Sequence, residues 1–226
     1  MSIPNHIAFA SSVDAELITA PGAGNYIHIV GISIYNNDIT YGNDVTVRLT
    51  DGNGGTNLYG GASGAMYLPA RGGGWDLKMS YNHPYWDLSE NTELYLDISS
   101  AKVVAGAIWY FIDTTAIYDI KHATFDLTAN TSVISAVADQ TIKVVGFSVH
   151  NNDTDDDEIV RLTDGSGGTN LYGTASGAIY LHCGGGVFGL PMSYSNPWFE
   201  LTTNTALYIT VDNGKRVSGT VWYYQD

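Results

Sequence analysis

The sequence VRLTDGNGGTNLYG, at Val47 to Gly60, occurs again as VRLTDGSGGTNLYG at Val160 to Gly173, where Asn53 is replaced by Ser166. The two copies then stay aligned at a constant offset to the end of the chain. A repeat spaced this widely is too long for a solenoid, whose units are 20–45 residues. The repeat therefore predicts two copies of one domain.

Each copy of this stretch has the pattern of a β-hairpin. Val47 and Leu49 alternate with Arg48 and Thr50, as in a strand with one buried face. Asp-Gly-x-Gly-Gly follows, and Leu-Tyr comes next. The pattern predicts a strand, a glycine turn and a second strand.

The flanking sequence also reads as short strands. Tyr26 to Asp38 (YIHIVGISIYNND) matches Thr141 to Asp153 (TIKVVGFSVHNND), and both end in Asn-Asn-Asp, which is a turn signal. In each copy we count about eight short strands at spacings of roughly 8–12 residues, which is typical of an antiparallel sandwich or barrel. We therefore expect an all-β fold of two tandem homologous antiparallel β-sandwich domains, each jelly-roll-like.

The repeat also suggests boundaries. Residues 1–12 have no close equivalent in the second copy, so we interpret them as an N-terminal arm or a first edge segment. Residues 13–113 are the first predicted domain and residues 123–226 the second. The predicted linker, residues 114–122, has a sequence that allows one helical turn.

Charge and composition exclude several classes of function. The formal charge of −14 at pH 7 argues against direct contact with nucleic acid or an anionic membrane, because phosphates attract Lys and Arg. No run of eighteen apolar residues is present, and residues 1–12 do not resemble a signal peptide. Cys183 is the only cysteine, so no disulfide is expected within the chain.

Two groups of carboxylates are candidate calcium ligands. Asp51 and Asp164 lie in the repeated glycine turns, where an Asp also commonly accepts backbone N–H groups of its own turn. We favour this structural role, because neither turn has the alternating ligands and final Glu of an EF-hand. The second group is an acidic loop found only in the second copy, and a solvated loop is the simpler interpretation for it. Its members are Asp153, Asp155, Asp156, Asp157 and Glu158.

No pattern indicates an enzyme or a cofactor. The histidines lack metal-ligand spacing, and the glycine-rich turns lack the Lys-Ser/Thr of a phosphate loop. Asp87 and Glu200 occupy equivalent positions, but each appears isolated beside aromatic residues. His182 and Cys183 are adjacent, so on a strand they would point to opposite faces. We therefore expect no catalytic residues, no bound metal and no cofactor.

Aromatic residues after each glycine-rich turn are the remaining candidates. Exposed rings there would bind sugars or a protein partner, whereas buried rings would fill the core or a subunit interface. Trp109 and Trp222, on the closing strands, are assigned to packing. The possible ligand platform comprises Tyr85, Trp86, Trp198 and Phe199, with Trp75, Tyr81, Phe188 and Tyr194 nearby in sequence.

The order of motifs resembles that of phage head decoration, or cement, proteins with jelly-roll-like domains. The resemblance rests on I-x-x-V-G-x-x-x-x-N-N at Ile27 to Asn37 and Ile142 to Asn152, then on L-T-D-G-x-G-G-T-N-L-Y-G. L-P-x-x-G-G at Leu68 to Gly73 and a closing G-x-x-W-Y complete it. It spans nearly all of both copies, but this chain has two copies instead of one, and His182 replaces Pro69 in the second.

The resemblance implies a non-enzymatic virion protein on the outer surface of a capsid. Its implied partners are the major capsid protein and itself, in a homotrimer. We expect contacts from the features that the copies do not share. These residues are Ser2, Ile3, Pro4 and Asn5 of the arm and Asp155, Asp156 and Asp157 of the acidic loop.

Two other functions fit the same features. Tandem β-sandwiches with exposed aromatic residues also serve as carbohydrate-binding modules or tail-type adhesins, and fold alone does not separate these functions. A plain structural spacer in a larger assembly is a third alternative.

Overall fold

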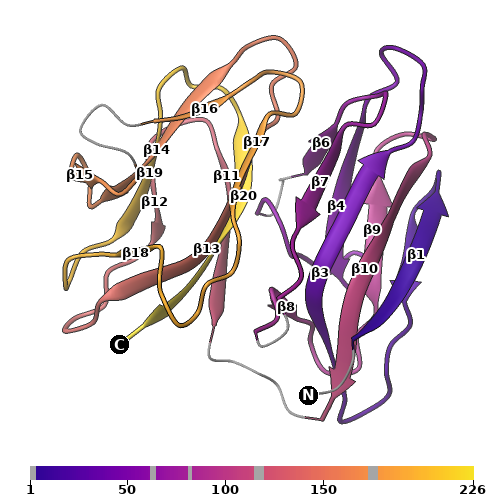
Figure 1. Ribbon diagram of the computed structural model, residues 1–226, viewed down its shortest axis with the longest axis horizontal. Coiled ribbons are helices and arrows are strands. Elements are labelled where there is room, and N and C mark those ends of the chain that lie inside the picture. Colours follow the sequence, from indigo (N-terminus) through magenta and orange to yellow (C-terminus); the bar gives the residue numbers. More distant parts are fainter. Residues whose placement is uncertain (1–3, 62–64, 81–82, 115–119, 173–177) are drawn as a thin grey trace. The chain divides into compact units, whose positions relative to one another are not determined.

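The chain folds into two compact all-β units, Met1–Asp119 and Ile120–Asp226 (Figure 1). The computed structural model describes residues 4–61, 65–80, 83–114, 120–172 and 178–226. Within these ranges the secondary structure is entirely β-strand, paired antiparallel, which confirms the predicted fold class. No helix in them is long and apolar enough to cross a membrane.

The described part of unit 1 contains ten strands that form two sheets. They are β1 (Asn5–Ser11), β2 (Ala15–Ile18), β3 (Tyr26–Asn36), β4 (Val45–Asp51), β5 (Thr56–Asn57), β6 (Met66–Leu68), β7 (Gly74–Leu77), β8 (Trp86–Asp87), β9 (Leu94–Ile98) and β10 (Val104–Asp113). One sheet has the order β1-β10-β3, with β7 and β8 both paired to β3. The other has the order β2-β9-β4, with β5 and β6 both paired to β4.

Unit 2 repeats this arrangement strand for strand. Its strands are β11 (Lys121–Leu127), β12 (Thr131–Ile134), β13 (Ile142–Asn151), β14 (Glu158–Asp164), β15 (Thr169–Asn170), β16 (Ile179–Leu181), β17 (Val187–Leu190), β18 (Phe199–Glu200), β19 (Leu207–Val211) and β20 (Val217–Gln225). The sheet orders are β11-β20-β13 with β17 and β18, and β12-β19-β14 with β15 and β16. In both units the chain passes back and forth between two sheets, as in a jelly roll.

The glycine turn joins β4 to β5 as the sequence predicted. Asp51 pairs with Thr56, so four residues close the hairpin. Gly52 and Gly54 have φ of 88° and 69°, a left-handed region that disfavours side chains. A Cβ on Gly55 would lie 1.9 Å from the Asp51 carbonyl oxygen. The turn therefore needs its glycines, which explains why Asp-Gly-x-Gly-Gly is kept in both copies.

Alternating apolar residues of the facing sheets form the core of each unit. In β9, Leu94 and Leu96 are buried and Tyr95 between them is half-buried, which is the alternation of a strand with one buried face. Trp222 is buried, and Trp109 is half-buried. Each of these tryptophans lies against a glycine of the neighbouring strand. Their predicted packing role is confirmed.

The N-terminal residues form the edge segment that was one of the two interpretations, and the expectation that they have no equivalent in the second copy was wrong. Strand β1 pairs with β10 along its whole length, and β11 pairs with β20 in the same way. Phe9 is the partner of Gly106, and Phe125 is the partner of Gly219. Residues 5–11 therefore form an edge strand that has an equivalent in unit 2. The sequences of these edge strands diverge because their outward positions are not held by packing.

The predicted linker was also too long. Lys121 and His122 belong to β11, so the linker ends before them. Part of the predicted helical turn, residues 115–119, lies outside the described residues. Ser2 and Ile3 of the predicted contact arm and Tyr81 of the aromatic group also lie outside them.

Candidate functional site

The repeated aspartates fasten one loop of each unit to another. The Asp51 carboxylate accepts hydrogen bonds from the Ser89 backbone N–H at 3.0 Å and from its hydroxyl at 2.5 Å. Asp164 accepts the same two bonds from Thr202, at 3.0 and 2.6 Å. The expectation that each Asp serves its own turn was wrong, because the partner follows β8 or β18, 38 residues further along. A side-chain hydroxyl at both partner positions was the available sequence signal.

The Asn-Asn-Asp motif places a buried amide at the end of β3 and of β13. The Asn36 side-chain N–H₂ donates to the carbonyls of Asn43 and Leu68, at 2.8 and 3.1 Å. Asn151 donates in the same way to the carbonyls of Asp156 and Leu181, at 2.9 and 3.1 Å. Both asparagines have no exposed surface. Because every buried carbonyl needs a donor, these amides hold the start and the end of the β3–β4 connection together.

A third repeated contact fixes the segment after β6 and β16. The Asp44 carboxylate accepts the Ala70 N–H at 2.8 Å and the hydroxyl of Tyr67. Its equivalent, Asp157, accepts the Cys183 N–H at 2.7 Å and the hydroxyl of Tyr180. The Tyr180 hydroxyl, followed by the Cys183 N–H, holds the pKa of Asp157 below its usual value. Asp157 is thus a structural carboxylate.

The rest of the acidic loop is also bonded internally. Asp153 accepts the backbone N–H groups of Asp155 and Asp156, at 3.0 and 2.9 Å, and these bonds lower its pKa. The Asp156 carboxylate lies 2.6 Å from Lys215 Nζ. Asp155 and Asp156 are exposed, as a contact role requires.

Glu158 is the fully buried member of this cluster and stands where unit 1 has Val45. It accepts backbone N–H groups from Ile159, Asn213 and Lys215, at 2.6, 2.8 and 2.6 Å. Three donors balance its desolvation. Among the described residues, no group of three or more His, Cys, Asp or Glu side chains is arranged to hold a metal ion.

The four residues of the proposed aromatic platform do not form one surface. Tyr85 and Trp86 are 2% and 1% exposed, and the Trp86 ring packs in the core with its centroid 6.2 Å from that of Trp75, tilted by 40°. Phe199 is half-buried and packs against the core of unit 2. Trp198, at 43%, is the exposed one of the four.

A shared hydrogen bond explains the positions of Tyr85 and Trp198. The Tyr85 hydroxyl donates to the Lys78 carbonyl at 2.7 Å. Trp198 Nε1–H donates to the equivalent carbonyl, that of Pro191, also at 2.7 Å. Each ring therefore fastens the loop between two strands of its sheet, and in unit 2 the larger ring remains partly accessible.

Asp87 is not isolated, contrary to the expectation from sequence. Its Oδ1 lies 2.6 Å from Nδ1 of the buried His28, and Phe111 stacks on that imidazole at 4.6 Å. In unit 2, Lys143 replaces His28 and is the strand partner of Glu200. The pairing was missed because His28 and Asp87 are 59 residues apart in sequence.

Unit 2 has a similar arrangement with a lysine in place of the histidine. Lys143 Nζ lies 2.8 Å from Asp226 and 5.6 Å from the centre of the Tyr224 ring, which occupies the place of Phe111. An acid, a base and an aromatic ring recur, but the acidic and basic groups differ between units. Because the acidic and basic residues differ between the two units, we interpret this arrangement as a packing feature and not as a catalytic one.

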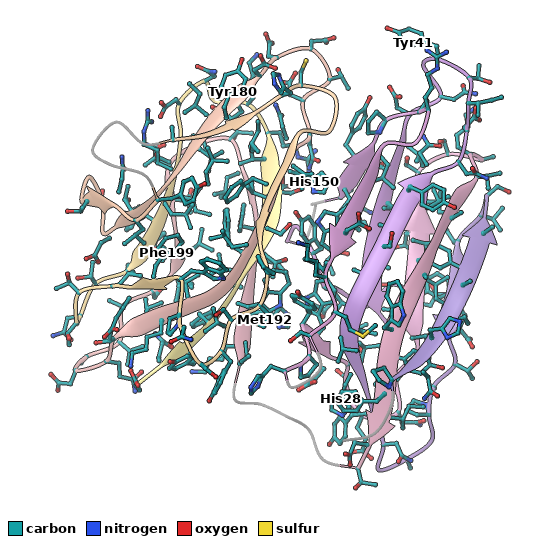
Figure 2. The ribbon with its side chains drawn as sticks, viewed as in Figure 1. His28, Tyr41, His150, Tyr180, Met192 and Phe199 are labelled. Atoms are coloured by element: carbon teal, nitrogen blue, oxygen red, sulfur yellow. The ribbon has the colours of Figure 1, made fainter. Side chains whose placement is uncertain are left out.

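The connection between β3 and β4 presents the most exposed apolar side chains. Ile39 and Tyr41 are 83% and 88% exposed, and Tyr35 and Val103 are exposed beside them. We call these four residues the unit 1 tip. Tyr41 lies at one end of unit 1 and His28 towards the other (Figure 2). The Asn37 N–H donates to the Val103 carbonyl at 2.8 Å, which joins the two chain segments of the tip.

Comparisons with protein-family models and with curated proteins give no match for this chain. Any inference about its function therefore rests on the geometry of the two units.

Proposed function

We propose that the protein is a non-enzymatic virion structural protein that decorates and stabilises the outside of a phage capsid. The observation that carries the proposal is the unit 1 tip. Exposed apolar side chains that occur together, as Ile39 and Tyr41 do in the unit 1 tip, are typical of a surface that a partner covers. The partner in this proposal is the major capsid protein.

Two further features support this role. The jelly-roll strand order is common in viral capsid domains, although lectin domains share it. The carboxylates that might have formed a reactive or metal-binding site are instead bonded to backbone N–H groups, as in Asp153 and Glu158. Such groups stabilise loops, and a rigid loop loses less entropy when a partner binds.

The mode of action follows from mass action. A protein that binds the assembled shell, and not its free subunits, stabilises the shell by its binding free energy. Two units in one chain, in a homotrimer, would multiply the contacts and raise avidity. In this proposal the tip supplies apolar contact, and Asn5 on edge strand β1 with Asp155 and Asp156 supplies polar contact.

Co-sedimentation with purified phage particles tests the proposal. We expect the protein to pellet with particles, and the double substitution I39D and Y41D to abolish this, because two buried charges would face the capsid. The matched control is D155A with D156A in the equivalent loop of unit 2, which should weaken pelleting less. Equal pelleting of the tip variant and the unaltered protein would contradict the proposal. Light scattering measures the trimer directly.

A carbohydrate-binding module or tail-type adhesin is the second candidate, favoured by the accessible face of Trp198. Aromatic faces stack on sugar rings. Migration through polysaccharide gels tests it. If Trp198 binds a glycan, W198A should restore free migration and W198F should stay retarded, because Phe keeps the ring face. Unretarded migration of the unaltered protein would exclude this candidate for the polysaccharides used.

A further inference from the structure

A small open pocket lies on unit 1, on the outer face of the sheet β2-β9-β4. Its volume is about 260 Å³, and the side chains that matter for its chemistry are Asp14, Thr46, Arg48, Asp97 and Ser99. All of them are polar or charged. None was singled out by its sequence pattern.

The floor of the pocket is an opposed pair of charges. Arg48 on β4 and Asp97 on β9 are direct cross-strand partners. Arg48 lies between the buried Val47 and Leu49, and Asp97 follows the buried Leu96, so both side chains point outward from the sandwich. Burial raises the pKa of Asp97, the nearby Asp14 raises it further, and the Arg48 guanidinium opposes them. All three groups line the same pocket.

The wall is fixed by backbone hydrogen bonds. Asp14, just before β2, accepts the Ile98 N–H at 2.7 Å through Oδ1. Ser99 Oγ accepts the Thr46 N–H at 2.9 Å. These bonds hold a carboxylate and a hydroxyl in place at the rim without a ligand, which lowers the entropic cost of binding.

The equivalent face of unit 2 shows which of these groups the fold needs. Asn130 stands in place of Asp14 and accepts the same backbone bond, from Val211 N–H at 2.9 Å. The positions of Asp97 and Ser99 are taken by Thr210 and Asp212, and Asp212 forms an ion pair with Arg161. An uncharged side chain therefore stands at the equivalents of both acidic positions, so the fold does not require a carboxylate at either one.

The chemistry of the groups limits what can bind. Carboxylates only accept hydrogen bonds, and a guanidinium only donates them. A cation would meet Arg48, and an anion would meet Asp14 and Asp97. A sugar hydroxyl both donates and accepts, so neighbouring hydroxyls on one ring satisfy both kinds of group without carrying charge.

We propose that this pocket binds a single sugar residue through its ring hydroxyls. Its volume falls just below the range of about 300–1,000 Å³ that holds drug-sized ligands, which suits one ring. The ring hydroxyls donate to Asp14 and Asp97 and accept from Arg48, with Ser99 and Thr46 at the rim. The inference does not rest on the capsid proposal, and its site is not Trp198.

Saturation-transfer NMR with the full chain tests it, using the methyl glycosides of glucose, galactose, mannose and N-acetylglucosamine as probes. We expect at least one glycoside to bind, and D97T to weaken it about tenfold or more, the loss of one hydrogen bond to a charged group. Thr is the residue that unit 2 carries there, so D97T should fold, as circular dichroism would verify. R48M should have a similar effect.

The matched control is R161M in unit 2, which should leave binding unchanged. W198A should also leave it unchanged, and this separates the pocket from the aromatic surface of the second candidate function. Failure of all four glycosides to bind would overturn the proposal, as would binding that survives D97T and R48M. A trisaccharide that ends in the bound sugar then tests the source of the ligand. Tighter binding of the trisaccharide would indicate the end of a glycan, and weaker binding would indicate a free monosaccharide.

Discussion

At the end of β3, unit 1 presents Ile39 and Tyr41 to solvent, whereas unit 2 has Asp155 and Asp156 in the equivalent connection. The buried amide beneath the connection is nevertheless the same, Asn36 in one unit and the equivalent asparagine in the other. Both donate to two backbone carbonyls. The exposed side chains of the connection therefore differ completely between the units, whereas the buried asparagine that holds the connection is the same.

The same division holds elsewhere in the two units. The bonds from Asp51 and Asp164 to a distant loop are shared, and so are the bonds from Tyr85 and Trp198 to a carbonyl. The outer face around Arg48 is not shared. We therefore infer that the side chains that bond to buried backbone groups are needed for the fold. Exposed differences show where each unit is free to bind.

The largest expected effect comes from the glycines opposite the edge strands. A Cβ on Gly106 would lie 2.1 Å from the Ser33 carbonyl oxygen, and one on Gly219 would lie 2.1 Å from that of Ser148. We expect G106A and G219A each to destabilise their own unit by about 3 kcal/mol, because a backbone clash cannot relax locally. Hydrogen exchange resolved by peptide should place each loss in one unit only. A loss of protection from exchange in both units would contradict the expectation that the two units unfold independently.

Next in size are the buried asparagines. N36A and N151A each leave one buried and one partly buried carbonyl without their donor, at a cost of about 2–3 kcal/mol. Because the bonds match, the two losses should agree within about 0.5 kcal/mol in urea titrations. A much smaller loss in one unit would show that water replaces the amide there and would break the equivalence.

Loss of the partly exposed hydrogen bonds of Asp51 and Asp164 should destabilise the protein less. D51A and D164A should each cost about 1 kcal/mol, since a partly exposed charged acceptor is replaced by water on mutation. D51N and D164N keep an acceptor and serve as controls with smaller losses. Removal of calcium with a chelator should not change the melting temperature. A drop in the melting temperature would restore the calcium hypothesis for these turns.

The smallest effect is a difference in acid sensitivity. In unit 2, backbone donors lower the pKa of Asp153, and the Tyr180 hydroxyl lowers that of Asp157. A carboxyl whose pKa is lower in the folded state stabilises above its unfolded pKa of about 4, and this stabilisation is lost as pH falls through the folded value. Unit 2 should therefore weaken below about pH 4.

Unit 1 should respond less to acid. Backbone N–H groups lower the pKa of Asp38 and Glu93, but burial raises that of Asp97, which acts in the opposite direction. The raised pKa of Asp97 adds stability that is present at low pH and lost as pH rises through its folded value. Hydrogen exchange at pH 3 and pH 7 measures the difference, and D157N should reduce it. Greater acid loss in unit 1 would contradict this sign.

Much of the fold could be predicted because its signals are local. The hairpin at Asp51, the alternation in β9 and the duplication all appear within short windows of sequence. The equivalence of β1 to β11 was missed because it depends chiefly on Phe9 and Phe125, each facing a glycine. Two matching residues in seven do not stand out without the pairing.

The candidate sites were harder to predict because they depend on distant partners. Asp87 appears isolated until β3 brings His28 beside it. Tyr85 and Trp198 have equivalent places in sequence, yet one ring is buried and the other is 43% exposed. The pocket around Arg48 involves strands β4 and β9 and the residue before β2, and no spacing along the chain predicts that convergence.

The pairing of β1 with β10 has a consequence for biosynthesis. Phe9 opposite Gly106 and Phe125 opposite Gly219 are nearly interchangeable contacts, so β1 could also pair with β20. Such exchange between similar repeats is a common route to misassembly. On the ribosome, β10 emerges before any strand of unit 2, so unit 1 can close before its competitor exists. A denatured full-length chain has no such order, and it should refold with a lower yield than the newly made protein achieves.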